Sequence, residues 1–122
     1  AVLPAPNRLR KRADFTSAVR SSGGCRAGSR LLVVHATSTD TRAGLPPRVG
    51  FVVSKAVGGA VVRNRTKRRL RAMVADRLPG IPNGLDLVVR ANPPAATATF
   101  GELAGALDPL LHKVIRRLGG AA

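Results

Sequence analysis

Hydrophobic and polar residues alternate in different patterns along the chain, and each pattern predicts a kind of element. Residues 31–36 (LLVVHA) form a short apolar run rich in β-branched side chains, which predicts a buried strand. Strict alternation of apolar and other residues predicts two further strands at 48–54 and 85–91. From 60 to 78, apolar side chains fall on one side of a helical wheel and arginines on the other, which predicts an amphipathic helix.

Two further helices are predicted at the ends of the chain. A short helix is expected at 13–21, where apolar residues recur at helical spacing before a pair of glycines. The last helix is expected to begin at Thr99, because Glu102 stands three residues later at the spacing of a capping box. Pro109 interrupts this helix and predicts a kink or break near Asp108, since proline removes one backbone donor and crowds the preceding turn.

The predicted order is helix, strand, strand, helix, strand, helix, which indicates an α+β fold with a single small sheet packed against helices. A chain of this length has room for one domain, so residues 1–122 are expected to form a single domain. Residues 38–47 combine Ser, Thr, Asp and Gly with a Pro-Pro pair, and they predict a flexible loop. Cys25 lies in a glycine-rich segment and is interpreted as a small loop side chain; as a lone cysteine it has no partner for an internal disulfide.

The charge of the chain points to a polyanionic partner. Lys and Arg number 21 against 6 acidic residues, which gives a net charge of +15 and a pI of about 12.0. Residues 63–71 (RNRTKRRLR) contain six basic side chains and no acid, directly after the glycines at 58 and 59. Nucleic acid is the predicted partner. The sequence contains no apolar run of membrane-spanning length and no signal-peptide pattern, so the predicted location is the cytoplasm and no membrane is expected as a partner.

Residues suited to catalysis are scarce. The six carboxylates are scattered singly, so the pattern predicts neither an acid–base pair nor a metal cluster. His35 is interpreted as a packed or edge-facing strand residue, and His112 as solvated surface. Among the three aromatic side chains, Phe51 and Phe100 are assigned to the core, and Phe15 is the open candidate for stacking. We therefore expect no catalytic or metal-binding residues on this chain.

Residues 49–71 (VGFVVSKAVGGAVVRNRTKRRLR) closely resemble the protein subunit of bacterial ribonuclease P, whose signature is an RNR-containing helix after a strand that ends in Ser-Lys. The resemblance extends to 7–15 (NRLRKRADF), to the LDLVVRANP strand and to the terminal helix. It implies a protein that assembles with a large catalytic RNA to remove 5′ leaders from precursor tRNA. It also implies that Mg²⁺ ions held on the RNA perform the chemistry, that the protein itself binds no cofactor, that it is monomeric within the complex, and that its βαβ crossover is left-handed.

The resemblance also assigns site residues. The face toward the catalytic RNA maps onto Arg63, Asn64, Arg65, Lys67, Arg68 and Arg71. The cleft for the single-stranded leader maps onto Arg12, Phe15, Val19, Leu31 and Lys55. Val19 and Leu31 stand where family members often carry aromatic residues, so this cleft is expected to depend on Phe15 and on electrostatic attraction.

Two other functions have the same general features. A ribosomal-type or general RNA-chaperone module would share the size and charge of the chain, but it would not need the Ser-Lys and RNR motifs together. A self-sufficient nuclease would cleave RNA in a metal-dependent reaction without an RNA subunit. Reconstitution with a ribonuclease P RNA discriminates among the three.

Overall fold

The structure is a computed structural model that describes residues 3–9, 24–38 and 42–118. Its elements are η1 (Ala5–Asn7), β1 (Cys25–Gly28), β2 (Leu32–Ser38), β3 (Arg48–Val52), α2 (Ala60–Arg77), η3 (Leu78–Gly80), β4 (Leu85–Ala91), η4 (Pro93–Thr97) and α3 (Phe100–Arg117). The predicted first helix at 13–21, with Phe15 and Val19, lies outside the described residues, as does Arg12. Neither α2 nor α3 is long and apolar enough to cross a membrane.

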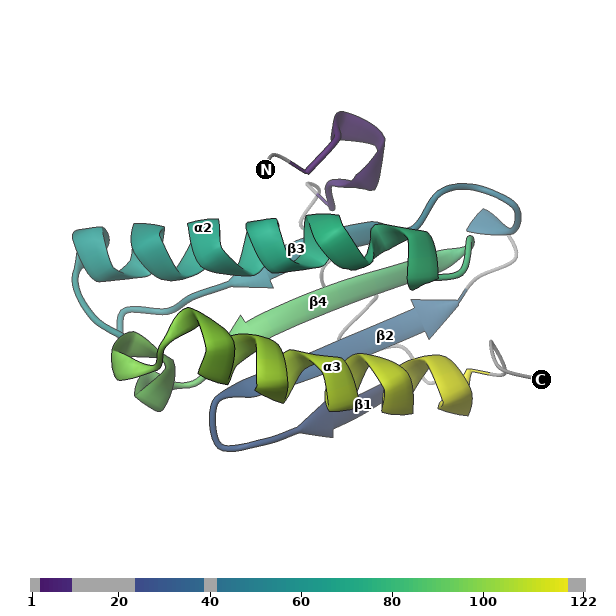
Figure 1. Ribbon diagram of the computed structural model, residues 1–122. Helices are drawn as coiled ribbons and strands as arrows, with labels where there is room; N and C mark the ends of the chain where they lie inside the picture. The colour runs from purple at the N-terminus through teal and green to yellow at the C-terminus, as the bar shows by residue number, and fades with distance from the viewer. Residues whose placement is uncertain (1–2, 10–23, 39–41, 119–122) are drawn as a thin grey trace.

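The four strands form one sheet in the order β1-β2-β4-β3. β2 is antiparallel to both β1 and β4, whereas β3 and β4 are parallel neighbours. A parallel pair requires a crossover connection, and α2 provides it. Both α2 and α3 lie on the same side of the sheet (Figure 1). The predicted α+β fold is confirmed.

The connection from β3 through α2 to β4 is left-handed. In Figure 1, α2 lies in front of the sheet, β3 and β4 both run from right to left, and β4 lies below β3. When this view is turned so that both strands point upward, with α2 still toward the viewer, β4 lies to the left of β3. This arrangement is a left-handed connection. About 98% of such connections are right-handed. The general rule would thus have failed here, and the family resemblance predicted the hand correctly.

The two faces of the sheet have different surroundings. On the face covered by α2 and α3, here called the helix face, alternate strand residues join one core with both helices. Its most buried members include Leu32, Val34, Leu87 and Val89 from the strands, Leu70, Met73 and Val74 from α2, and Leu103, Leu107 and Val114 from α3. The opposite face, here called the second face, has a smaller apolar cluster in which Val52 packs against buried Leu9 and Val88.

The strand β1 was not predicted. Cys25, which sequence analysis placed in a loop, begins this strand and pairs with Ala36 of β2. Its side chain faces α3, where Sγ lies 3.6 Å from the carbonyl oxygen of Val114. Burial raises the pKa of the Cys25 thiol, and nearby Arg117 opposes this effect in part. The thiol is therefore held as a packed, protonated side chain.

Of the kink or break predicted near Asp108, the break is wrong and the kink stays a prediction. α3 begins with the expected capping box, in which the hydroxyl of Thr99 accepts from the Glu102 amide and the Glu102 carboxylate accepts from the Thr99 amide. The helix then continues through Pro109 to Arg117. Pro109 and Gly105, whose carbonyl loses its usual partner, are both exposed. Water can hydrate that carbonyl, and the buried stripe holds the helix together on the other side.

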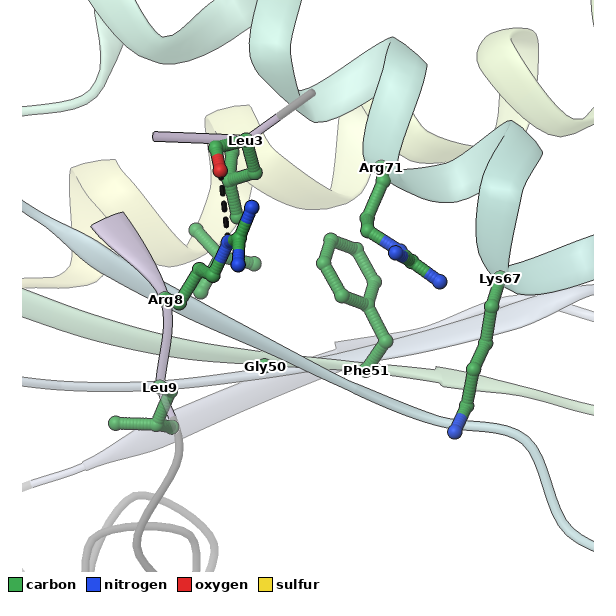
Figure 2. A pocket seen from close by; sticks show the side chains of 8 residues that line it. Leu3, Arg8, Leu9, Gly50, Phe51, Lys67 and Arg71 are labelled. Carbon is green, nitrogen blue, oxygen red and sulfur yellow. Dashed lines mark hydrogen bonds between the residues drawn. The ribbon is translucent and has the colours of Figure 1, made fainter. Parts of the chain in front are cut away.

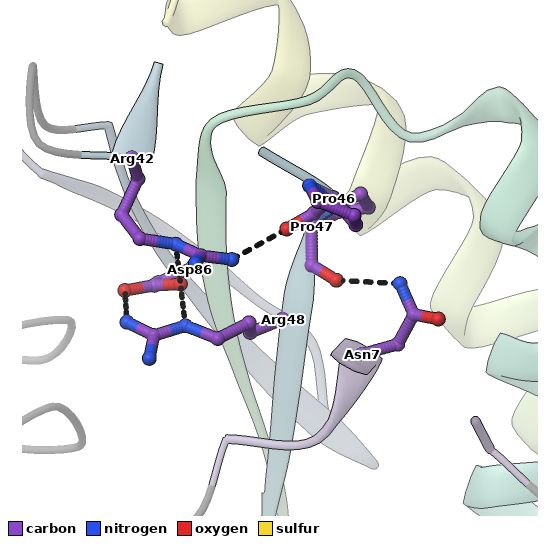
Figure 3. Close-up of polar contacts among 6 residues, drawn as sticks. All are labelled: Asn7, Arg42, Pro46, Pro47, Arg48 and Asp86. Atoms are coloured by element: carbon purple, nitrogen blue, oxygen red, sulfur yellow. Dashed lines mark hydrogen bonds and ion pairs between the residues drawn. The ribbon is translucent and has the colours of Figure 1, made fainter. Parts of the chain in front are cut away.

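Polar contacts fix the segment before β3 (Figure 3). The carboxylate of Asp86 accepts two hydrogen bonds from Arg48, at 2.9 and 2.7 Å, and its Oδ1 lies 3.8 Å from Nε of Arg42. Arg42 in turn donates to the carbonyl of Pro46 at 2.6 Å, and Asn7 donates to that of Pro47 at 2.8 Å. The described part of the loop is therefore anchored both to β4 and to the N-terminal segment, while the predicted flexibility of residues 38–47 stays a prediction.

Candidate nucleic-acid interface

The basic helix α2 begins directly after the glycine pair. Gly59 is its N-cap, has an extended backbone and provides no side-chain cap, so the first amides of the helix face outward without a carboxylate or hydroxyl partner from the cap. The side facing the sheet buries Thr66, Leu70, Met73 and Val74. Thr66 satisfies its hydroxyl by donating to the carbonyl of Val62 at 2.9 Å. The helix is thus anchored by one narrow stripe, and its other sides are open to partners.

The basic side chains of α2 occupy three sides of the helix. Asn64 and Arg68 are exposed on the side farthest from the sheet. Arg65 and Arg69 lie on the side toward α3, and Lys67 and Arg71 on the side toward β3 and the N-terminal segment; each pair lines a separate hollow. Arg63 is half-buried, and its Nε has no hydrogen-bond partner among the described residues. The predicted RNA-binding residues therefore form a ridge that spreads to both flanks.

No acidic residue neutralises this ridge within the described part of the chain. The ion pairs recorded there join Asp86 to Arg42 and Arg48, and Asp108 to Arg77. None of them involves a basic residue of 63–71. The single carboxylate on α2 is Asp76, near its C-terminal end. Within the described residues the ridge keeps its positive charge, as a surface for phosphate binding requires.

On the β3 side, the ridge borders a pocket of about 220 Å³ (Figure 2). Phe51 points into this pocket from β3, between Arg71 of α2 and Arg8 of the N-terminal segment. Nε of Arg8 donates to the carbonyl of Leu3 at 2.8 Å, which fixes the wall opposite α2. Phe51 was assigned to the core; it is half-buried and packs against the core cluster, but it also lines this basic pocket.

The second face of the sheet carries another basic group. Arg26 of β1 and Arg90 of β4 are exposed, and the register places Arg26 directly opposite His35. His35 and Thr37 are buried, and Nε2 of His35 and Oγ1 of Thr37 have no hydrogen-bond partner among the described residues. Burial lowers the pKa of His35, and the charges of Arg26 and Arg90 lower it further. This face therefore combines unused polar atoms with positive charge.

The two predicted leader-binding residues that the structure describes, Leu31 and Lys55, lie in different surroundings. Lys55 is exposed in the turn between β3 and α2, whereas Leu31 is buried in the core of the helix face. Arg12, Phe15 and Val19 lie outside the described residues. His35, which sequence analysis interpreted as a packed strand residue, lies on the second face, where Leu31 does not. Leu31 and His35 are four residues apart, so strand alternation alone would put both on one face. Leu31 precedes β2, which begins at Leu32, and the alternation therefore does not apply to it.

Sequence analysis also misplaced one aromatic residue. Phe100, assigned to the core, is 45% exposed at the start of α3, beside Arg65 and Arg69. Arg69 belongs to the basic run but was not named as a contact residue. Elsewhere in the described residues, no group of three or more His, Cys, Asp or Glu side chains is arranged to hold a metal ion.

Comparison with known proteins identifies the family of this chain. The family model described as Ribonuclease P matches residues 3–115. The chain belongs to the ribonuclease P protein family. A relative within this family, the ribonuclease P protein component of Streptomyces griseus subsp. griseus, is 54% identical, and the match covers 99% of both chains. That of Beutenbergia cavernae is 57% identical over 88% of this chain and 87% of the relative.

Solved structures of ribonuclease P proteins have the same fold. The protein from Staphylococcus aureus is 28% identical, with a TM-score of 0.75 over 88% of this chain and 94% of that chain. The protein from Thermotoga maritima is 26% identical, with a TM-score of 0.71 over 89% of this chain and 96% of that chain. The ribonuclease P protein fold is therefore preserved in this chain, including the sheet and both described helices.

Proposed function

We propose that this chain is the protein cofactor of a ribonuclease P ribonucleoprotein that removes the 5′ leader of precursor tRNA. In this proposal, α2 docks on the catalytic RNA, and Mg²⁺ held on that RNA supports the cleavage. The observation that carries the proposal is the ridge on α2, whose basic residues have no acidic partners in the described structure. Arginine suits this role because its planar guanidinium can donate two hydrogen bonds to one phosphate.

Reconstitution tests the proposal directly. The full chain is combined with the ribonuclease P RNA of a relative such as Streptomyces griseus, and precursor-tRNA cleavage is measured at low Mg²⁺. We expect the protein to raise the cleavage rate under these conditions. Unchanged cleavage together with general RNA annealing activity would favour the RNA-chaperone alternative. Metal-dependent cleavage by the protein without RNA would favour the nuclease alternative.

A pair of double variants tests the role of α2. R65A/R68A removes two ridge cations, and K113A/R116A removes the same charge from exposed positions on α3. We expect R65A/R68A to weaken assembly with the RNA subunit by more than about tenfold, since hydrogen bonds to charged groups contribute about 1.5–3 kcal/mol each. The control should bind nearly as well as the unmodified chain. Equal losses in both variants would mean that net charge, and not the ridge, determines binding.

The proposal also gives the second face a role in binding the single-stranded leader. Arg26 and Arg90 would attract its phosphates, and the unused polar atoms of His35 and Thr37 are placed between strands that carry these arginines. The contributions of Arg12, Phe15, Val19 and Lys55 remain part of this proposal through the family resemblance. Leu31 is not part of this proposed leader contact, because its side chain is buried in the core.

Leader binding is tested by comparing two substrates. R26A/R90A should weaken binding of precursor tRNA to the reconstituted complex and leave binding of mature tRNA unchanged, because the mature molecule has no leader. An equal loss for both substrates would contradict a leader contact on this face.

A further inference from the structure

An exposed aromatic side chain lies beside arginines where α2 meets the start of α3. Phe100 is 45% exposed, although it occupies the first position of a helix whose leucine and valine residues are buried. Two adjoining hollows, of about 470 and 500 Å³, share Arg65, Arg69 and Phe100 as lining residues. Arg68 lines the first of them as well. Three cations and one aromatic ring therefore border a single open surface.

The two arginines on this flank are held in place by backbone carbonyls. Nη2 of Arg65 donates to the carbonyl of Ala96 at 3.3 Å, and Nη1 of Arg69 donates to that of Ala98 at 3.2 Å. Both acceptors belong to the short segment between β4 and α3. A guanidinium carries five N–H donors, so one such bond leaves others for a ligand. Because these long side chains are already ordered, binding a phosphate requires less loss of side-chain entropy.

The surface contains no competing acid. No lining residue of either hollow is acidic. Glu102, the carboxylate closest to Phe100 in sequence, accepts a hydrogen bond from the Thr99 amide at 2.8 Å as part of the capping box. The Glu102 carboxylate is therefore held by the backbone at the helix N-terminus. The hollows present positive charge and an aromatic face together.

We propose that this surface binds an unpaired nucleotide of an RNA strand, with the base stacked on Phe100 and the adjacent phosphates held by Arg65, Arg68 and Arg69. A phosphate alone would not require an exposed ring, and an apolar partner would not favour three arginines. Every base has a π-face, so such a platform binds bases with little dependence on sequence. The proposal rests on the proposed function in that it identifies one contact of the same RNA-binding helix.

The binding test uses RNA with and without bases. Affinity of the full chain is measured for a single-stranded oligoadenylate of about ten nucleotides and for an abasic ribose-phosphate strand of the same length. F100A should weaken oligoadenylate binding by roughly 5-fold to 100-fold, the range that alanine substitution of stacking residues gives. It should leave abasic binding unchanged. L45A is the matched control, because Leu45 is 43% exposed and lines neither hollow, and it should change neither affinity.

Fluorescence provides a second readout. The chain contains neither Trp nor Tyr, so F100W introduces a single fluorophore, and L45W does the same at the control position. We expect oligoadenylate to quench the emission of F100W strongly and that of L45W weakly. Quenching of both to the same degree, or equal loss of abasic and oligoadenylate binding in F100A, would overturn the stacking proposal.

This result can be separated from the proposed function. If F100A and the unmodified chain bind oligoadenylate equally while R65A/R68A still fails to assemble with ribonuclease P RNA, the stacking site is wrong and the cofactor role stands. If F100A weakens oligoadenylate binding while the unmodified chain has no effect on precursor-tRNA cleavage, the site is supported and the cofactor role fails. Tighter binding of polyglutamate than of oligoadenylate would assign the surface to an acidic protein and overturn the proposal.

Discussion

Asp86 is a buried carboxylate of β4 that binds Arg48 at the start of β3. It accepts two hydrogen bonds from Arg48, whose side chain is 20% exposed, and it lies near Arg42. D86N keeps the shape of the side chain but removes its charge. Breaking a buried pair costs about 3–5 kcal/mol. The partial exposure of Arg48 reduces the expected loss to about 2–4 kcal/mol in urea unfolding followed by circular dichroism.

The control for this variant is D108N. Asp108 pairs with Arg77 but is 56% exposed, and Arg77 lowers the pKa of Asp108 mainly through their hydrogen bond. Exposed pairs contribute less than about 1 kcal/mol. D108N should therefore leave the free energy of unfolding nearly unchanged. Equal effects of the two substitutions would contradict a structural role for the Asp86 contacts.

His35 should make the fold sensitive to mild acid. Its pKa in the folded state is lowered by burial and then by Arg26 and Arg90, so near pH 6.5 the unfolded chain binds more protons than the folded chain. The stability that neutral His35 provides is present above that pH and is lost as the pH falls below it. The free energy of unfolding should therefore decrease between about pH 7 and pH 5.5, and less so in H35Q.

H112Q is the control for the pH experiment, since His112 is exposed on α3. It should keep the pH dependence of the unmodified chain. If H35Q also keeps that dependence, another group is responsible for the acid sensitivity.

Single residues show where reading the sequence succeeds and fails. The cations of residues 63–71 were predicted as a surface because no acid lies among them, and none of the ion pairs between described residues involves them. Phe100 was misassigned because its helical-wheel position lies within the apolar stripe of α3. The first turn of α3 extends past the tip of β4 (Figure 1), so no strand lies beneath it. A wheel records direction around a helix but not where the neighbouring element ends.

At the scale of elements, α3 offers a direct test of how a helix accommodates proline. P109A restores the backbone donor to the Gly105 carbonyl within a helix that is already continuous. Proline is about 3 kcal/mol less favourable than alanine inside a helix. The greater freedom of the unfolded variant offsets part of this difference. We therefore expect P109A to stabilise the protein by about 1–3 kcal/mol in urea unfolding, and destabilisation would mean that the proline ring makes a packing contact of its own.

Sequence analysis found the elements that are long enough to show a periodic pattern of apolar residues. β4 matches its predicted bounds, and α2 and β3 differ from theirs only at the C-terminal end. β1 was missed because it has four residues, ends in Gly28 and forms the edge of the sheet. Its pairing with β2 is a tertiary contact that no local pattern records. The glycine-rich segment around β1 was therefore interpreted as a loop.

At the scale of the whole molecule, the excess of positive charge predicts strongly salt-dependent RNA binding. The logarithm of the affinity should fall by roughly 0.7–0.9 per contacted phosphate for each tenfold rise in salt. R65A/R68A should reduce this slope by about 1.5 if each arginine contacts one phosphate. K113A/R116A should leave it unchanged, as measured by filter binding across a salt series. A slope that is the same in all three proteins would place the phosphate contacts elsewhere.

The left hand of the β3–α2–β4 crossover decides which side of the sheet the basic helix occupies. With the same strand order and directions, a right-handed connection would put α2 on the second face, the face that carries Arg26, His35 and Arg90. Instead, the sheet separates the two basic surfaces, with α2 and α3 on one side and the second face on the other (Figure 1). Two RNA molecules held on these sides would be kept apart by a fixed thickness of protein. Under the proposed function, the fold would then act as a spacer that fixes the distance between the leader on the second face and the RNA subunit on the helix side.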